Sequence, residues 1–349
     1  MELGEPPPDP FAGMNPQERK RAQERIILER VYDTSQYSSV EERERPDFAL
    51  VRNRKSRPFG VEVTQLFPTE SHARLNLVHG YMHQLWGGGL HLHKKDKKEL
   101  KAVRFEVRDA SGALKHTDVP GILMQTPDAH AFQARLAEVI RGKTERAYEL
   151  EDLSHMNLII LDWFHPQFDC ERFWTGDFLS PGVRQALSKS PFREVFLLVH
   201  NTVPHQTLPP GEPFVPDLRI VRLQQLLAWE RMFVTGHIVD EEVGESLDSV
   251  DRLNRLVIDH VSRVQGYGEP AEHDGRAWLR YAGCAITIGE TGTMIRDYQD
   301  FEIHEFGTPD IGDPLEAPTE THIARRAEDA VMECGYTEPA RELPVEERP

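Results

Sequence analysis

Two short, continuous apolar runs, at residues 157–163 and 194–200, constrain the fold of this chain more than any other feature of its sequence. An uninterrupted apolar run of this length is typical of a β-strand that is covered on both faces. A helical pattern at 181–188 separates the two runs, and strands that alternate with helices indicate an α/β domain. We therefore predict an α/β fold in which helices flank a mixed sheet.

The segments before these runs fit the same architecture. Residues 16–32 begin with a proline, which suits the first turn of a helix, and carry Ile27, Leu28 and Val31 on one stripe. A turn-like sequence separates two apolar segments, which predicts a β-hairpin of 48–52 and 59–66. Three further elements are expected: a helix at 71–86 ended by three glycines, a half-exposed strand at 102–108 taken as the third strand of the sheet, and a helix from 126 to about 148.

In the C-terminal half, the sequence predicts two helices and one segment that contains a strand. Helical spacing is present at 223–234 and 247–264, whereas 277–289 fits either a pair of strands or a helix followed by a strand. The expected organisation is a disordered leader at 1–15, an α/β domain at 16–205 with an insertion at about 68–100, a C-terminal α+β region at 206–307 that is mainly α, and an acidic, proline-rich tail at 308–349.

The net charge of −17 at first argues against a nucleic-acid partner. However, the charge is unevenly distributed: residues 51–150 hold 17 basic and 11 acidic side chains, a net of +6, whereas residues 301–349 have a net of −9. Attraction to phosphate depends on the local field and not on the total. The first half of the chain can therefore still present a basic surface.

Several classes of protein are disfavoured because their patterns are missing. No stretch reaches the roughly 18 apolar residues that a membrane span requires, and the start of the chain lacks the apolar core of a secretory signal, so we expect a cytoplasmic protein. The three cysteines, Cys170, Cys284 and Cys334, include no C-x-x-C pair, which argues against a disulfide framework and a zinc knuckle. The sequence has neither a G-x-S-x-G elbow nor a G-x-x-x-x-G-K-[ST] phosphate loop, so ATP hydrolysis is not expected.

Two carboxylates carry the clearest chemical signal. Asp47 stands at the start of the first hairpin strand and Glu62 in the middle of the second, 15 residues later, so antiparallel pairing can bring them side by side. Glu62 stands between Val61 and Val63, where a carboxylate is costly unless a cation compensates it. Two carboxylates and a main-chain carbonyl form a hard oxygen site for Mg²⁺, which can activate water and neutralise charge on a phosphoryl group.

The order of these features resembles the PD-(D/E)xK nuclease superfamily over roughly residues 17–163. The shared pattern is an initial helix, Pro46-Asp47 at the start of a strand, Glu62 in the next strand, and then a helix and a buried strand. The resemblance implies a restriction-endonuclease-like sheet and a site in which Asp47, Glu62 and the carbonyl of Val63 bind Mg²⁺ or Mn²⁺.

The chain departs from the family pattern at Thr64, where the family has a lysine that orients or deprotonates the attacking water. Lys143, on the helix before the buried strand, is the candidate for a migrated lysine. Glu24 lies on the apolar stripe of the first helix, where the resemblance implies a glutamate near the metal, whereas Glu29 lies off that stripe. The insertion after Glu62 is the second departure, at a place where relatives handle substrate.

Each of these site residues also has an ordinary interpretation. Asp47 can simply begin a strand, Glu62 can face solvent from an edge strand, and Lys143 can be a solvated helix residue. Glu24 can be a salt-bridge partner of a nearby basic residue. The four histidines His79, His83, His91 and His93 lack an accompanying zinc motif, and we assign them structural or surface roles.

Two basic clusters are candidates for phosphate binding. One occupies the hairpin turn and the other follows the three glycines, and their members are Arg52, Arg54, Lys55, Arg57, Lys94, Lys95, Lys97 and Lys98. Such groups make salt-sensitive contacts that do not depend on base sequence. The alternative is a solvated surface that protects a sheet edge.

These features predict a Mg²⁺-dependent or Mn²⁺-dependent endonuclease that acts on DNA more readily than on RNA, by analogy in bacterial defence or repair. The C-terminal half would then provide specificity, regulation or an interface with a protein partner or a second copy in a homodimer. The alternative is a catalytically inactive nuclease-fold module, in which Thr64 marks the lost chemistry and the fold binds nucleic acid, a nucleotide or a protein partner.

Overall fold

The computed structural model describes residues 9–108, 111–124, 128–163, 178–201, 217–243, 249–282, 284–289 and 292–297. Residues 1–8 of the expected leader and the whole expected acidic tail lie outside the described residues. The described end of the leader is held in place, because Asp9 forms an ion pair with Arg19 at 2.5 Å. Asn15 caps the first helix, α1 (Pro16–Val31), through a capping box with Glu18.

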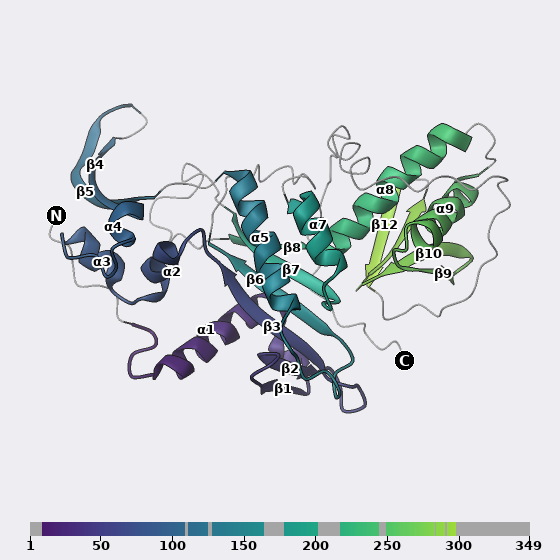
Figure 1. Ribbon diagram of the computed structural model, residues 1–349, viewed down its shortest axis with the longest axis horizontal. Helices are drawn as coiled ribbons and strands as arrows, with labels where there is room; N and C mark the ends of the chain where they lie inside the picture. Colours follow the sequence, from purple (N-terminus) through teal and green to yellow (C-terminus); the bar gives the residue numbers. More distant parts are fainter. Residues whose placement is uncertain are drawn as a thin grey trace.

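A six-stranded mixed sheet forms the centre of the molecule (Figure 1). Its strands, in spatial order, are β1 (Ser39–Glu42), β2 (Phe48–Val51), β3 (Phe59–Leu66), β6 (Met156–Asp162), β7 (Glu194–Asn201) and β8 (Asp217–Arg222). The first three are antiparallel, β3, β6 and β7 are parallel, and β8 is antiparallel to β7. The expected mixed sheet and the hairpin of β2 and β3 are confirmed.

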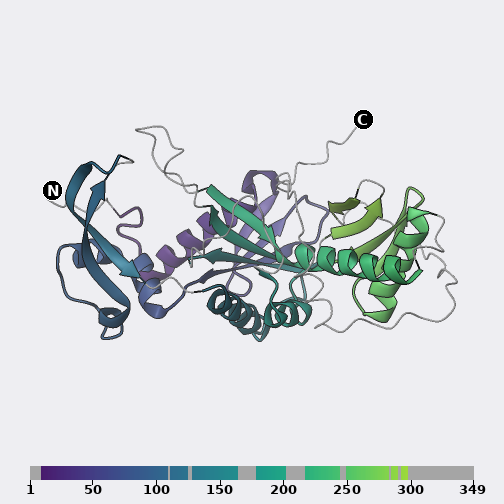
Figure 2. The same ribbon diagram turned by 90° about the horizontal axis from the view of Figure 1, so that it is seen from above.

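Helices cover both faces of this sheet, as Figure 2 shows from above. On one face, Ile27 and Leu28 of α1 pack in a cluster with Val63 of β3. On the other face, α5 (Ala129–Thr144) and α7 (Pro181–Ser188) pack in a cluster with alternate residues of β6, including Leu158 and Ile160. Because both faces of β6 and β7 are covered, the central residues of each strand, 158–161 and 195–199, are apolar without interruption, which is the pattern that predicted them.

An insertion between β3 and α5 forms a separate small unit at one end of the molecule (Figure 1). It contains α2 (Glu70–Leu77), α3 (Tyr81–Trp86), α4 (Asp96–Glu99), β4 (Leu100–Arg108) and β5 (Leu114–Met124). The strand expected at 102–108 is β4, which pairs with β5 in a two-stranded sheet, so its assignment to the central sheet was wrong. The insertion therefore continues to about residue 124. The assignment failed because alternation identifies a half-exposed strand but not the strand with which it pairs.

The single helix expected at 71–86 is divided in two. Gly80 adopts a positive φ of 74° and lies between α2 and α3. The two helices are held together by Asp96, a fully buried carboxylate that accepts hydrogen bonds from Ser71 Oγ at 2.8 Å and Tyr81 OH at 2.7 Å. Arg74 completes this centre with a 2.6 Å ion pair to Asp96.

The C-terminal part combines helices with a sheet, which agrees with the α+β region expected there. Its elements are α8 (Leu223–Val243), α9 (Val250–Asp259), the π-helical turn η4 (His260–Val264), β9 (Glu269–His273), β10 (Arg276–Tyr281), β11 (Cys284–Gly289) and β12 (Gly292–Asp297). The strands form one antiparallel sheet in the order β12-β11-β10-β9. The boundary expected after residue 205 also moves, because β8 belongs to the central sheet. Neither β8 nor β9 carries a continuous apolar run that would have revealed it.

The packing of β3 against Pro46, the residue before Asp47, can be tested at Gly60. A Cβ atom at Gly60 would lie 2.6 Å from Pro46 Cγ and 2.8 Å from Leu153 Cδ1. We expect Gly60→Ala to lower the free energy of unfolding in urea by about 1–3 kcal/mol, because an overpacked site must shift its neighbours.

The matched control is Gly142→Ala in α5, where a Cβ would meet nothing within 4 Å. Alanine should stabilise this helix by about 1 kcal/mol. A Gly60→Ala variant as stable as the unchanged protein would contradict the close packing of Pro46 on β3.

Candidate active-site cleft

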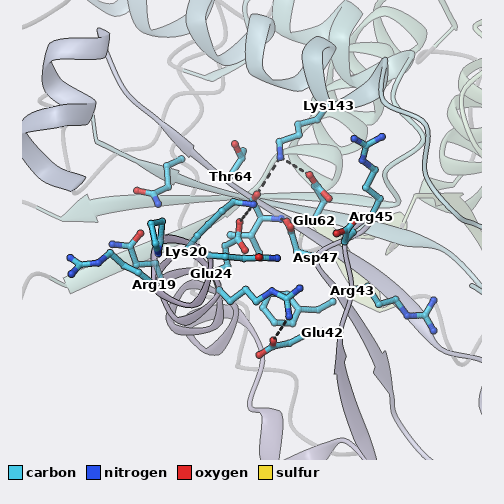
Figure 3. A pocket seen from close by; sticks show the side chains of 18 of the residues that line it. Arg19, Lys20, Glu24, Glu42, Arg43, Arg45, Asp47, Glu62, Thr64 and Lys143 are labelled. Carbon is cyan, nitrogen blue, oxygen red and sulfur yellow. Dashed lines mark hydrogen bonds and ion pairs between the residues drawn. The ribbon is translucent and has the colours of Figure 1, made fainter. Parts of the chain in front are cut away.

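The candidate site is a cleft of about 690 Å³ beside the free edge of β3 (Figure 3). β2 pairs with β3 only from Phe48, opposite Val61, to Leu50, opposite Phe59. From Glu62 onward, β3 has β6 on one side and no strand on the other in the described part of the chain. Residues from α1, the β1–β2 turn, β3 and α5 line the cleft that results.

Asp47 lies where β2 leaves β3. The register that places Phe48 opposite Val61 brings Asp47, one residue earlier, beside Glu62, one residue later. Asp47 is 8% exposed, and its Oδ2 accepts a hydrogen bond from the main-chain N–H of Val63 at 2.8 Å. The carboxylate therefore takes the place of a neighbouring strand at this point of the edge.

Glu62 and Lys143 form a buried ion pair across the cleft. Glu62 is 2% exposed, and Lys143, in the last turn of α5, donates to its Oε1 at 2.5 Å and to the Val63 carbonyl at 3.3 Å. Arg146, three residues further along, donates to the same Oε1 at 3.3 Å. The other carboxylate oxygen, Glu62 Oε2, is buried and has no hydrogen-bond partner among the described residues.

Glu24 enters the cleft from the opposite side, on α1. It is buried on the stripe that carries Ile27 and Leu28, and its Oε1 lies 3.1 Å from Lys20 Nζ. Glu29 instead lies on the exposed side of α1, where it pairs with Arg25 at 2.8 Å. The structure thus brings together Asp47, Glu62, Lys143 and Glu24, with Thr64 also lining the cleft.

Three buried carboxylates, Asp47, Glu62 and Glu24, gather in the cleft, although its lining as a whole is rich in basic residues. Burial, together with the charges of Glu62 and Glu24, raises the pKa of Asp47 to about 7. Burial opposes the charged form of Lys20, but its hydrogen bond to Glu24 and the charges of Asp47 and Glu62 raise the pKa of that lysine overall. The neighbouring carboxylates thus disfavour the ionised form of Asp47 and favour the charged form of Lys20.

The donors in the cleft fit a divalent cation bound by a small number of protein ligands. Among the described residues, no group of three or more His, Cys, Asp or Glu is arranged to hold a metal ion. The ligands that the resemblance implies, Asp47, Glu62 and the Val63 carbonyl, all belong to residues that line the cleft, and the unpartnered Oε2 of Glu62 is the observation that fits a cation. Mg²⁺ often binds through one or two carboxylates and keeps several waters.

The basic residues that line the cleft differ from those expected for phosphate binding. They are Arg19, Lys20, Arg21, Arg43, Arg45, Lys143 and Arg146. The expected residues Arg52, Arg54, Lys55 and Arg57 follow β2, at its opposite end from Asp47, and Lys94, Lys95, Lys97 and Lys98 lie in the insertion. None of these eight is among the residues that line the cleft.

Two sequence signals could have identified the missed residues. Lys20 precedes Glu24 by one helical turn and Arg146 follows Lys143 by one turn, so both lie near a candidate site residue. Arg43 and Arg45 stand in the turn between β1 and β2, but β1 was not predicted, and the hairpin that places them at the cleft was therefore not recognised.

Comparisons of the chain with models of known families, with curated proteins and with solved structures found no match. Among the described residues, no helix is both long and apolar enough to cross a membrane. The function of the cleft must therefore be inferred from its own geometry and chemistry.

The raised pKa of Asp47 predicts a pH-dependent stability in the metal-free protein. The folded state binds a proton near pH 7, whereas the unfolded aspartate has its ordinary value of 3.8, so stability falls as pH rises from about 4 to 7. Each unit of difference corresponds to about 1.4 kcal/mol. We expect Asp47→Asn to raise the melting temperature in EDTA, and to do so more at pH 8 than at pH 5.

The control carboxylate is Asp96, where the expected sign is opposite. Despite its burial, hydrogen bonds from Arg74, Tyr81 and Ser71 hold the pKa of Asp96 below its ordinary value. Asp96→Asn should therefore lower the melting temperature near neutral pH. Equal effects of Asp47→Asn at pH 5 and pH 8 would contradict the proposed electrostatics of the cleft.

The Lys143–Glu62 pair should be coupled energetically. Lys143→Met leaves Glu62 buried beside only the half-exposed Arg146, and breaking a buried pair in this way costs about 3–5 kcal/mol. Arg135→Met, which removes an exposed pair with Glu138 on the same helix, should cost less than about 1 kcal/mol.

Urea denaturation of Glu62→Gln, of Lys143→Met and of the double variant Glu62→Gln/Lys143→Met measures this coupling. We expect Glu62→Gln to recover part of the stability that Lys143→Met loses, because it removes the uncompensated charge. A Lys143→Met variant no less stable than Arg135→Met would show that the pair is not buried in solution.

Proposed function

We propose that this protein is a divalent-metal-dependent nuclease of the PD-(D/E)xK type, which hydrolyses phosphodiester bonds of DNA in preference to RNA. The observation that carries the proposal is the cleft itself. Asp47, directly before β2, lies beside Glu62 of β3, Lys143 donates to both Glu62 and the Val63 carbonyl, and basic residues line the same space. A polyanion and a divalent cation together match this distribution of charge.

The order of elements supports the finer assignment of the fold. Helix α1, the antiparallel strands β1, β2 and β3, helix α5 and the parallel strand β6 follow one another, apart from the insertion. Apart from β1, this is the order on which the resemblance to the nuclease superfamily is based. A restriction-endonuclease-like sheet is therefore part of the proposal.

Each residue of the cleft has a defined role in this proposal. Asp47, Glu62 and the Val63 carbonyl would hold Mg²⁺ or Mn²⁺, which when bound supplies Lewis-acid stabilisation and a more acidic water. Lys143 donates beside these oxygens and can orient the attacking water or stabilise the phosphoryl oxygens. Glu24 holds Lys20 at the opposite wall, and Arg43, Arg45 and Arg146 can bind the flanking phosphates.

A second candidate is a module that binds nucleic acid without cleaving it. The observation that favours it is the contact of Lys143 with both Glu62 Oε1 and the Val63 carbonyl, because the ammonium already compensates two of the oxygens that a metal would use. Thr64, in the place of the lysine of the resembled family, agrees with this alternative. Cleavage assays and binding assays separate the two functions.

The test of the proposed function is cleavage of plasmid, linear duplex DNA, single-stranded DNA and RNA with Mg²⁺, Mn²⁺ or EDTA. We expect metal-dependent cleavage that falls at least about a hundredfold in Asp47→Ala and in Glu62→Ala, because each removes a ligand of the catalytic metal. Glu29→Ala, on the exposed side of α1, should retain full activity.

A second pair of variants tests which basic surface binds the substrate. Arg43→Ala/Arg45→Ala should weaken DNA binding and reduce its salt dependence. Lys94→Ala/Lys97→Ala should have a smaller effect on both the affinity and its salt dependence.

Metal-dependent cleavage that is unaffected in Asp47→Ala and Glu62→Ala would refute the nuclease assignment. Salt-sensitive binding with no metal binding and no cleavage would favour the binding module.

A further inference from the structure

The cleft continues past the carboxylates to a part that the proposed chemistry does not use. Gln65 and Phe67, at the end of β3, line this part together with Leu77 of α2. Gln65 and Phe67 are half-buried, and Leu77 is 37% exposed. One end of the charged cleft therefore offers an amide, an aromatic ring and an aliphatic side chain.

The main chain of β3 also faces this end of the cleft. Gly60 N donates to His155 O, and Trp163 N donates to Leu66 O, so the even-numbered residues of β3 direct their main-chain groups toward β6. The odd-numbered residues face the other edge, as the contacts of Val63 with Asp47 and Lys143 show. The N–H and C=O of Gln65 consequently face the edge that β2 leaves uncovered.

The side chains here are held in a fixed arrangement. Trp163 Nε1 donates to Gln65 Oε1 at 2.8 Å, and the Gln65 Nε2 group has no partner among the described residues. The rings of Phe67 and Trp163 stack with a centroid distance of 5.8 Å and an interplanar angle of 4°. A rigid ring next to an amide donor and a main-chain donor and acceptor is suited to a flat, polar-edged heterocycle.

We propose that this end of the cleft is a subsite for one nucleobase, which stacks on Phe67 and forms hydrogen bonds with Gln65. The proposal rests on the proposed function and names its substrate class: a single strand, or a nucleotide displaced from a duplex. From Val63 to Gln65 the strand advances about 7 Å, which is comparable to the separation of phosphate and base within one nucleotide. A base paired in a duplex is stacked on its neighbours and cannot reach a surface beside β3.

The test measures binding in EDTA, so that it does not depend on catalysis. The probes are a short oligothymidine, an abasic oligomer of the same length and backbone charge, and the oligothymidine paired with its complement. We expect the oligothymidine to bind more tightly than either of the other two. Phe67→Ala should weaken its binding by roughly five- to 150-fold, the usual range for one stacked base, and leave abasic binding unchanged.

Two further variants separate base recognition from loss of folding. Phe67→Tyr keeps the aromatic ring and should keep the preference for the oligothymidine over the abasic oligomer. Phe105→Ala removes a 44% exposed ring of β4 that does not line the cleft, and it should leave all three affinities unchanged.

Equal binding of the abasic oligomer and the oligothymidine, or equal binding of duplex and single strand, would overturn the subsite. A preference that persists in Phe67→Ala would also overturn it. Failure of the subsite and failure of the nuclease assignment are distinguishable. If binding depends on the base but no cleavage occurs, the subsite is supported and the protein is a binding module. If metal-dependent cleavage occurs but binding does not depend on the base, the subsite is overturned and the nuclease assignment stands.

Discussion

The hydrogen bond from Val63 N–H to the Asp47 carboxylate is the contact on which the geometry of the cleft depends. β2 separates from β3 after only a few paired residues, and an uncovered strand edge with unsatisfied main-chain groups would be unfavourable. Asp47 satisfies the N–H of Val63, and Lys143 satisfies its carbonyl. Because side chains replace the missing strand, the edge remains open and is lined with charged groups.

The same arrangement gathers buried carboxylates at one place. Asp47, Glu62 and Glu24 share the cleft, and burial, together with the charges of Glu62 and Glu24, raises the pKa of Asp47. A strongly perturbed group that lies in a cleft is a candidate for a functional role. Asp96 provides the contrast: it is fully buried, but three donors satisfy it, and its pKa is lowered.

The sequence predicted those elements whose pattern follows from burial alone. The continuous apolar strands β6 and β7, the stripe of α1 and the β2–β3 hairpin have patterns that depend on local neighbours. The same local information placed Asp47, Glu62, Glu24 and Lys143 on the elements that form the cleft. It could not assign β4 to a separate sheet or reveal β1, β8 and β9, because pairing partners are determined by contacts distant in sequence. Arg43 and Arg45 were missed for this reason, since they approach the cleft only through the β1–β2 turn.

The central claim is that Asp47, Glu62 and the Val63 carbonyl bind one divalent cation. The most direct measurement is the anomalous scattering of manganese in crystals grown with Mn²⁺. We expect a single strong peak roughly 2.1–2.5 Å from an Asp47 oxygen, Glu62 Oε2 and the Val63 carbonyl, with Lys143 still beside the site. A cleft without a peak at saturating Mn²⁺, with Lys143 bonded to Glu62 and Val63, would contradict the claim.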